Sequence, residues 1–138
     1  MKKSLFKGVF TALITPFTDY NTVDYTSLER IVNYQIDAGI DGLVPCGTSG
    51  ESPTLSHEEH NRVIRQTIKF AHGRVPVIAG TGSNATNEAI SLSQRAQDDG
   101  VDAVLLVNPY YNKPHKRAYI CILKQLPTVS LSLVFFIT

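Results

Sequence analysis

The chain has 138 residues, 43% of them hydrophobic, and its 13 Lys and Arg nearly balance its 12 Asp and Glu, for a net charge of +1. This composition is typical of one globular domain and gives no reason to expect nucleic acid or an anionic membrane as a partner. No segment reaches the roughly 18 apolar residues of a membrane-spanning helix, and the first seven residues lack the apolar stretch of a signal peptide. Cys46 and Cys121 indicate no disulfide framework, so we expect a reducing, cytoplasmic location.

The first third of the chain predicts a strand, a helix and a second strand. Residues 9–14 form an apolar run that ends before a proline. Asp24 or Thr26 can cap a helix whose apolar side chains recur with helical spacing, and Gly39 stands where a left-handed C-cap is expected. Residues 40–46 are again apolar and too short a run for a helix, which predicts a buried strand.

The next elements repeat this order. Ser56 is followed three residues later by Glu59, which is the pattern of a helix capping box, and the second helix should end at Gly73. Residues 75–79 predict a third strand. Asn84 can cap a third helix.

Gly100 should end that third helix, and residues 101–107 predict a fourth strand. Apolar strands that alternate with helices predict an α/β protein with a parallel sheet. Residues 39–44 weakly resemble residues 100–105, and such repetition favours a (β/α) barrel over a doubly wound sheet. A closed eight-stranded barrel needs about 250 residues. Periodicity alone does not exclude a doubly wound sheet. If the sheet closes as a TIM (β/α)8 barrel, this chain holds about half of it, the N-terminal half, with about four βα units.

A glycine-rich loop, GTSGES, follows the second predicted strand at residues 47–52. Glycines let backbone N–H groups approach a ligand, and the hydroxyls of Thr48 and Ser49 can donate or accept a proton. In isolation, such a loop would more often be an ordinary turn. A phosphate loop would need a Gly-Lys-Ser/Thr ending, which is absent.

Four motifs in order resemble the dihydrodipicolinate synthase family of pyruvate-dependent class I aldolases. They are GTSGES, SPTLSHEEH at residues 52–60, VPVIAGTGSNATNEAI at residues 75–90 and PYYNKP at residues 109–114. The resemblance implies a TIM barrel, a homotetramer built from tight dimers, and condensation of pyruvate with aspartate semialdehyde in lysine (diaminopimelate) biosynthesis. No cofactor is expected. N-acetylneuraminate lyase, a sister aldolase, remains an alternative.

The resemblance also implies roles for individual residues. Thr48 matches a threonine of the proton relay, and Tyr111 matches a tyrosine that reaches in from the neighbouring subunit. Ser49 stands where the family has a second threonine, in the loop that holds the pyruvate carboxylate. The family's lysine forms a Schiff base with pyruvate, which acidifies the methyl group of the substrate.

A second set of residues matches the site at which family members bind L-lysine as a feedback inhibitor. The residues of this set are Ser52, Pro53, His57, His60, Asn84, Glu88 and Tyr110. A carboxylate suits an ammonium group, and the amide and phenol offer hydrogen bonds. Asn84 and His57 could equally be ordinary helix-start residues. A metal site on the two histidines is not expected, because no third ligand has helical spacing beside them.

The resemblance stops after Pro114. Codons for the family's continuation, shifted by one base, encode residues 115–126 of this chain, so we expect a frameshift, arising from gene decay or from a sequencing error. Residues 1–114 would then be the half-barrel and residues 115–138 an out-of-frame, non-family tail. The Schiff-base lysine would be missing, and the chain would be an inactive or non-catalytic fragment. Residues 131–137 are apolar and uncharged, which predicts aggregation.

Overall fold

The protein is described by a computed structural model that covers residues 6–112, positions 115, 117, 121 and 124, and residues 134–137. Its elements in chain order are β1 (Phe10–Ala12), α1 (Tyr25–Asp37), β2 (Gly42–Val44), α2 (His57–Ala71), β3 (Ile78–Gly80), α3 (Thr86–Asp99), β4 (Ala103–Val107) and β5 (Val134–Ile137). Short 3₁₀ turns lie at Thr48–Gly50 and Ser52–Thr54. The predicted alternation of strands and helices is confirmed, although the strands are shorter than the apolar runs that predicted them.

All paired strands run parallel. β1 pairs with β2, β3 pairs with β4, and β4 pairs with β5. A parallel bridge between Leu43 and Val77 joins the two groups, so the strands follow one another in chain order. Parallel neighbours need a crossover connection, and α1, α2 and α3 supply it for the first four strands. The chain is therefore an α/β structure of successive βα units.

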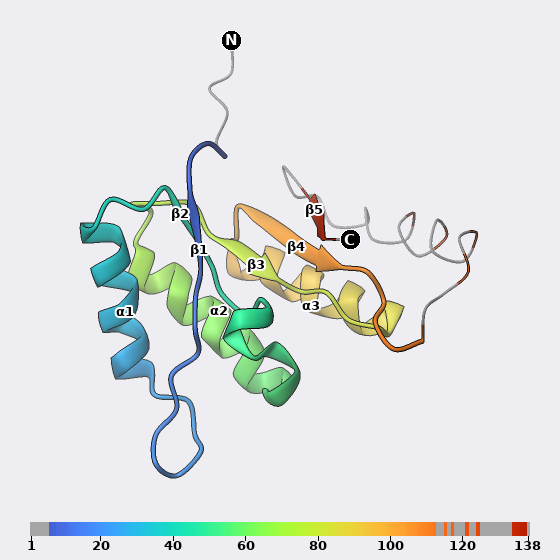
Figure 1. The fold of residues 1–138 in the computed structure, drawn as a ribbon, viewed down its shortest axis with the longest axis horizontal. Helices are drawn as coiled ribbons and strands as arrows, with labels where there is room; N and C mark the ends of the chain where they lie inside the picture. The colour runs from blue at the N-terminus through green and yellow to red at the C-terminus, as the bar shows by residue number, and fades with distance from the viewer. Residues whose placement is uncertain are drawn as a thin grey trace.

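The three helices lie side by side against one face of the strands (Figure 1). Successive side chains of a strand point to opposite faces, so each strand divides its residues between two environments. Leu43 and Val104 belong to the main core, which also contains Val32 of α1 and Ile64 of α2. Val44 and Ile78, together with Ala103, belong to a smaller cluster on the other face, against which Phe6, Phe10 and Leu105 pack.

Most of the predicted helix ends are confirmed. The side chain of Asp24 accepts hydrogen bonds from two N–H groups in the first turn of α1. These bonds, with that from the Ser27 hydroxyl as the largest cause, lower the pKa of Asp24. Ser56 and Glu59 form the predicted capping box at the start of α2. Gly39 and Gly100 have φ angles of 86° and 93°, in the left-handed region that glycine adopts without a steric penalty.

One predicted helix cap is wrong. Asn84 does not cap α3, because its neighbour Ala85 is the N-cap and makes no side-chain cap bond. The hydroxyl of Ser83 instead accepts a hydrogen bond from the Ala85 N–H, at 3.1 Å. The predicted end of α2 is confirmed, because the helix ends at Ala71 and both the cap residue His72 and Gly73 take left-handed conformations, with φ of 49° and 70°.

The segment predicted as a non-family tail contributes a fifth strand that the sequence did not predict. Val134–Ile137 pairs in parallel with β4, from Val104 to Val107. Backbone N–H and C=O groups make this pairing, and the free edge of β4 offers such groups to any extended segment. A strand can therefore form here whether or not the segment matches the amino-acid sequence of the family.

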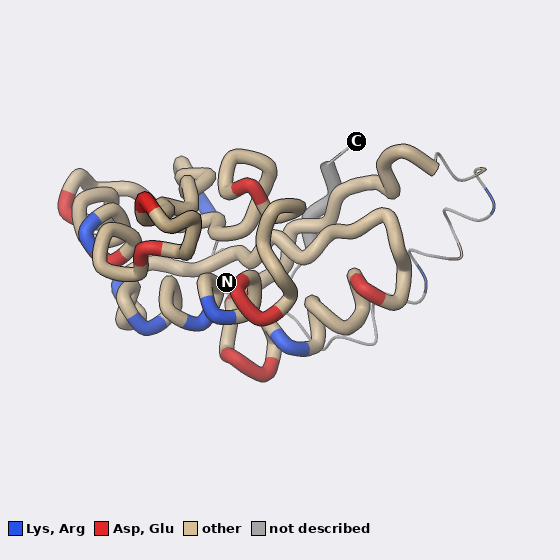
Figure 2. The backbone as a smooth tube through the Cα atoms, turned by 90° about the horizontal axis from the view of Figure 1, so that it is seen from below, with Lys and Arg blue, Asp and Glu red and all other residues tan. Residues whose placement is uncertain are grey.

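The surface of the described chain mixes charges of both signs, since Lys and Arg are interspersed with Asp and Glu along the backbone (Figure 2). This distribution agrees with the near-zero net charge. Within the described residues, no helix is long and apolar enough to cross a membrane.

Candidate functional site

The GTSGES loop begins where β2 ends. Cys46 has a left-handed φ of 55°, which turns the chain sharply into the 3₁₀ turn Thr48–Gly50. The first N–H groups of such a turn, those of Thr48 and Ser49, have no partner within it. The buried hydroxyl of Thr15, just after β1, donates to the Gly50 carbonyl at 2.7 Å and anchors the loop.

A small cavity of about 40 Å³ lies at this loop, and we call it the Thr48 cavity. It lies where β2, β3 and β4 end, and it is lined by Cys46, Gly47, Thr48, Ser52, Gly80, Gly82, Leu105 and Val107. Two of its glycines are needed for close packing, because a Cβ on Gly80 would lie 2.2 Å from the Cys46 carbonyl oxygen and a Cβ on Gly82 would lie 2.4 Å from the Val107 nitrogen. The carboxyl ends of parallel barrel strands are the edge at which TIM barrels hold their substrates.

The cavity contains no strong nucleophile among the residues described. Burial raises the pKa of the Cys46 thiol to about 12, so this side chain is neutral and inert. Thr48 lines the cavity and its side chain is exposed. Ser49 is exposed and lines neither this cavity nor the larger one beside it.

A larger cavity of about 190 Å³ lies between α2, α3 and the loops before them, and we call it the Glu88 cavity. Its lining contains six of the seven residues predicted for the lysine site, namely Ser52, Pro53, His57, His60, Glu88 and Tyr110. The seventh, Asn84, lies just before the N-cap of α3, and its carbonyl accepts a hydrogen bond from the Asn112 amide at 3.2 Å. Ser52 and Gly82 line both cavities, so the two share a wall.

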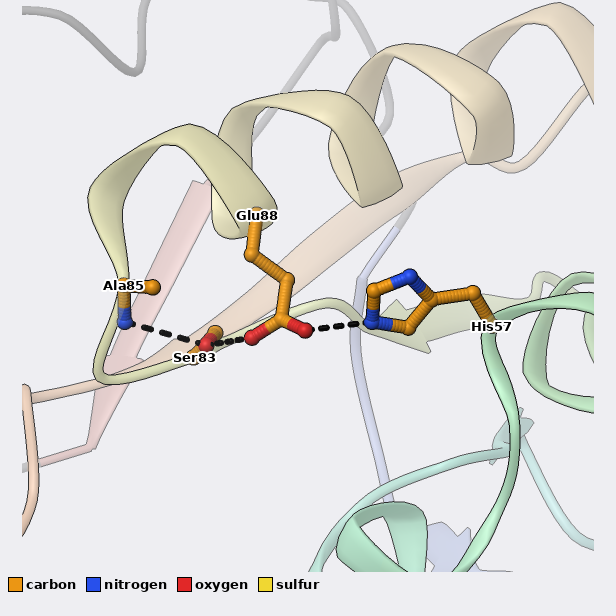
Figure 3. Close-up of polar contacts among 4 residues, drawn as sticks. All are labelled: His57, Ser83, Ala85 and Glu88. Atoms are coloured by element: carbon orange, nitrogen blue, oxygen red, sulfur yellow. Dashed lines mark hydrogen bonds and ion pairs between the residues drawn. The ribbon is translucent and has the colours of Figure 1, made fainter.

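The Glu88 carboxylate is held from two sides (Figure 3). The Ser83 hydroxyl donates to one oxygen, and His57 Nε2 contacts the other. These contacts, led by the Ser83 hydrogen bond, lower the pKa of Glu88, so the group is a carboxylate at neutral pH. The cavity therefore presents a fixed negative charge, which suits a cationic ligand.

His60 adds a second polar group to the same cavity. Its side chain is 4% exposed, and burial lowers its pKa, so the ring is neutral at pH 7. A hydrogen bond to the Gly80 backbone opposes this shift. The Nδ1 atom is buried and has no partner within the described chain. A buried ring nitrogen without a partner can accept a hydrogen bond from a ligand.

Tyr110 and Tyr111 are separated by the structure. Tyr110 lines the Glu88 cavity, whereas Tyr111 is 95% exposed and lines neither cavity. The φ angle of Tyr111 is 67°, a conformation that an aromatic residue rarely adopts, and the Asn112 N–H closes the turn on the Tyr110 carbonyl at 2.8 Å. Such outliers are concentrated at functional sites. Tyr111 and Thr48 therefore do not meet within one chain.

Several residues that line these cavities are not among those predicted from the sequence. The Ser83 hydroxyl donates a hydrogen bond to Glu88. Ser83 directly precedes Asn84, the predicted helix cap, and a serine beside a helix start could have been predicted to bond a nearby side chain. Leu55 and Leu92 also line the Glu88 cavity. No group of three or more potential ligands that could hold a metal ion is present in the part of the chain that the structure describes.

A sequence profile of the Dihydrodipicolinate synthetase family matches residues 5–126. The chain belongs to this family. Its fold is accordingly the N-terminal part of the family's TIM barrel, as predicted. The match continues past Pro114, and the predicted division of the chain at that residue stays a prediction.

Individual family members are similar to most of this chain. The 4-hydroxy-tetrahydrodipicolinate synthase of Magnetococcus marinus is 59% identical over 110 residues, which are 80% of this chain and 37% of that protein. The dihydrodipicolinate synthase of Aquifex aeolicus has a similar structure, with a TM-score of 0.91, 45% identity, and coverage of 95% of this chain and 44% of that one.

The structure of the Acinetobacter baumannii enzyme, described as chloride inhibited and complexed with pyruvate, has a TM-score of 0.89 and 43% identity, and covers 94% of this chain and 44% of that one. This chain thus spans less than half the length of these family members.

Proposed function

We propose that this chain forms the N-terminal part of a 4-hydroxy-tetrahydrodipicolinate synthase, which condenses pyruvate with L-aspartate 4-semialdehyde in lysine biosynthesis. The observation that carries the proposal is the Glu88 cavity, which six of the seven predicted effector residues line and which shares a wall with the Thr48 cavity. N-acetylneuraminate lyase is the less favoured alternative, because the effector set belongs to the synthase.

In this proposal the Thr48 cavity receives pyruvate. The N–H groups at the start of the 3₁₀ turn, with the Ser49 hydroxyl, would bind the pyruvate carboxylate, since backbone N–H groups of such turns favour anions. Thr48 would pass protons to and from the substrate. Tyr111 of a neighbouring subunit would complete the relay, which agrees with its exposed side chain and constrained backbone.

The Glu88 cavity would bind L-lysine as a feedback inhibitor. Its carboxylate suits an ammonium group, and His60 Nδ1 and the Tyr110 hydroxyl offer further hydrogen bonds. Ser52 and Gly82 border both cavities, so occupation of one can alter the other. In intact relatives, the tight dimer of the proposed tetramer would bring two such sites together.

The second part of the proposal is that a polypeptide of these 138 residues has no synthase activity. The family's Schiff-base lysine belongs to the sixth barrel strand, and none of Lys2, Lys3, Lys7, Lys69, Lys113, Lys116 and Lys124 matches it. Without the amine nucleophile the covalent route is absent. Borohydride reduction in the presence of pyruvate, followed by intact mass measurement, should show no adduct. A stoichiometric adduct on one lysine would refute this part.

The catalytic and effector roles are tested in a chimera that joins residues 1–114 to the remaining segment of the Magnetococcus marinus relative. We expect synthase activity with pyruvate and aspartate semialdehyde, and a loss of about 10²-fold or more in kcat for Thr48→Val. Thr54→Val is the matched control, because Thr54 lines neither cavity. Equal activity of the two variants would refute the role of Thr48.

The same chimera tests the effector site. Lysine should inhibit it, and Glu88→Gln should abolish inhibition while leaving activity in place. Glu29→Gln, an exposed carboxylate on α1, is the control. Flat activity of the parent chimera across a lysine titration would refute the effector role, and cleavage of N-acetylneuraminate without synthase activity would favour the sister aldolase.

A further inference from the structure

A groove of about 440 Å³ runs between α2 and α3 on the helical side of the fold. It is lined by His57, Glu58, Asn61, Arg62, Arg65 and Arg95, and we call it the arginine groove. Apart from His57, none of these residues takes part in the proposed synthase chemistry or in the Glu88 cavity. The proposed synthase function therefore does not account for the arginine groove.

Two side-chain contacts bridge α2 and α3 on either side of the two remaining arginines of the groove. His57 contacts Glu88 at the N-terminal end of the two helices, and Arg65 Nε lies 3.0 Å from Asp99 Oδ1 further along. Arg62 on α2 and Arg95 on α3 come between these pairs in the two sequences and line the same groove.

No carboxylate of the described residues lies within ion-pair distance of these two arginines. All twelve Asp and Glu side chains of the protein fall within residues 6–112, which the structure describes. None of them forms an ion pair with Arg62 or Arg95. Two guanidinium groups that share a groove repel each other, and an anion bound between them would offset this repulsion.

The groove is also partly organised for a ligand. The Arg62 guanidinium stacks over the Tyr25 ring, 4.4 Å from its centroid, which limits the conformational freedom lost on binding. The side-chain oxygen of Asn61 is buried and has no partner among the described residues, so this amide can turn to meet a ligand.

We propose that the arginine groove is an oxyanion-binding site for a phosphate group, held between Arg62 and Arg95. The planar guanidinium fork matches phosphate geometry and can donate two parallel hydrogen bonds. Arg65 keeps its bond to Asp99 and supplies additional positive potential. Glu58, the carboxylate that lines the groove, opposes binding and limits the affinity. This proposal does not depend on the synthase activity.

The test is a titration of inorganic phosphate with the 138-residue chain at fixed pH and ionic strength, followed by phosphorus NMR. We expect saturable binding, weakened about tenfold by Arg95→Gln, since a charge-assisted hydrogen bond contributes on that scale. Arg95 makes no ion pair, hydrogen bond or ring contact in the described chain, so its removal should leave the fold intact. Glu58→Gln should strengthen binding several-fold.

Arg30→Gln, which removes the same charge from the exposed surface of α1, is the matched control and should bind phosphate like the parent chain. Glycerol phosphate in a second titration distinguishes a phosphate ester from free phosphate: tighter binding of the ester would assign the site to phosphomonoesters, and equal binding would assign it to the phosphate group alone. A linear, non-saturating response of the parent chain would overturn the proposal, as would equal weakening by Arg95→Gln and Arg30→Gln.

Discussion

Replacement of Gly80 by alanine tests whether close approach of β2 and β3 builds the Thr48 cavity. The new Cβ would lie 2.2 Å from the Cys46 carbonyl oxygen, 2.6 Å from the Cys46 carbonyl carbon and 2.8 Å from the Gly47 nitrogen. All three atoms belong to the backbone, so no side chain can rotate away. The two strand ends must move apart, which strains the hydrogen bond from the Gly80 N–H to the Pro45 carbonyl, now 2.9 Å.

These contacts set the expected loss in the free energy of unfolding. Overpacking of a tight interior costs about 1–3 kcal/mol, and a weakened backbone hydrogen bond adds about 0.5–1.5 kcal/mol. We therefore expect Gly80→Ala to lower the free energy of unfolding by about 2–4 kcal/mol, which is a large part of the stability of an ordinary domain. At the slopes found for small proteins, this loss lowers the urea midpoint by about 1–2 M.

Gly47→Ala is the matched control in the same cavity. Gly47 has a φ of −78°, which alanine adopts freely, and a Cβ there would meet no atom within 4 Å. Urea unfolding followed by circular dichroism should therefore place this variant within about 0.5 kcal/mol of the parent chain. If the Gly80→Ala variant unfolds at the same urea concentration as the Gly47→Ala variant, the inference that β2 and β3 approach closely is refuted.

Three further predictions concern the helices and the sheet edges. Ser56→Ala removes the cap of α2 and should cost about 1 kcal/mol in urea unfolding, whereas the exposed Ser91→Ala should cost little, and equal losses would contradict the capping role. Burial lowers the pKa of His60, so the unfolded chain binds a proton first, and the free energy of unfolding should fall as the pH drops below about 6.5. A His60→Gln variant with the same pH slope would refute this. The edge of β1 away from β2 and the apolar residues 131–137 should cause association, and a monodisperse, cooperatively melting monomer in light scattering would contradict that expectation.

The sequence alone determined the features that depend on neighbouring residues. The capping box of Ser56 and Glu59 spans three positions, and its geometry follows from the residue types once a helix forms. The glycine at position 100 stops α3 because its left-handed conformation is costly for other residues. The order of strands and helices followed from the period of the apolar residues, because that period differs between the two structures.

The tertiary structure decided the features for which the local sequence offered more than one possibility or none. Asn84 and Ser83 both carry side chains that suit a helix start, yet Ala85 is the N-cap of α3. The Ser83 hydroxyl bonds Glu88 and the Ala85 N–H, and the Asn84 carbonyl accepts from Asn112, 28 residues away. The fifth strand depended on a free edge of β4, which no local pattern shows. Two ion pairs bridge α2 and α3, and they form only because the two helices lie side by side. The same packing brings Arg62 and Arg95 into one groove. Packing sets such distances between remote residues, and the period of a single helix carries no information about them.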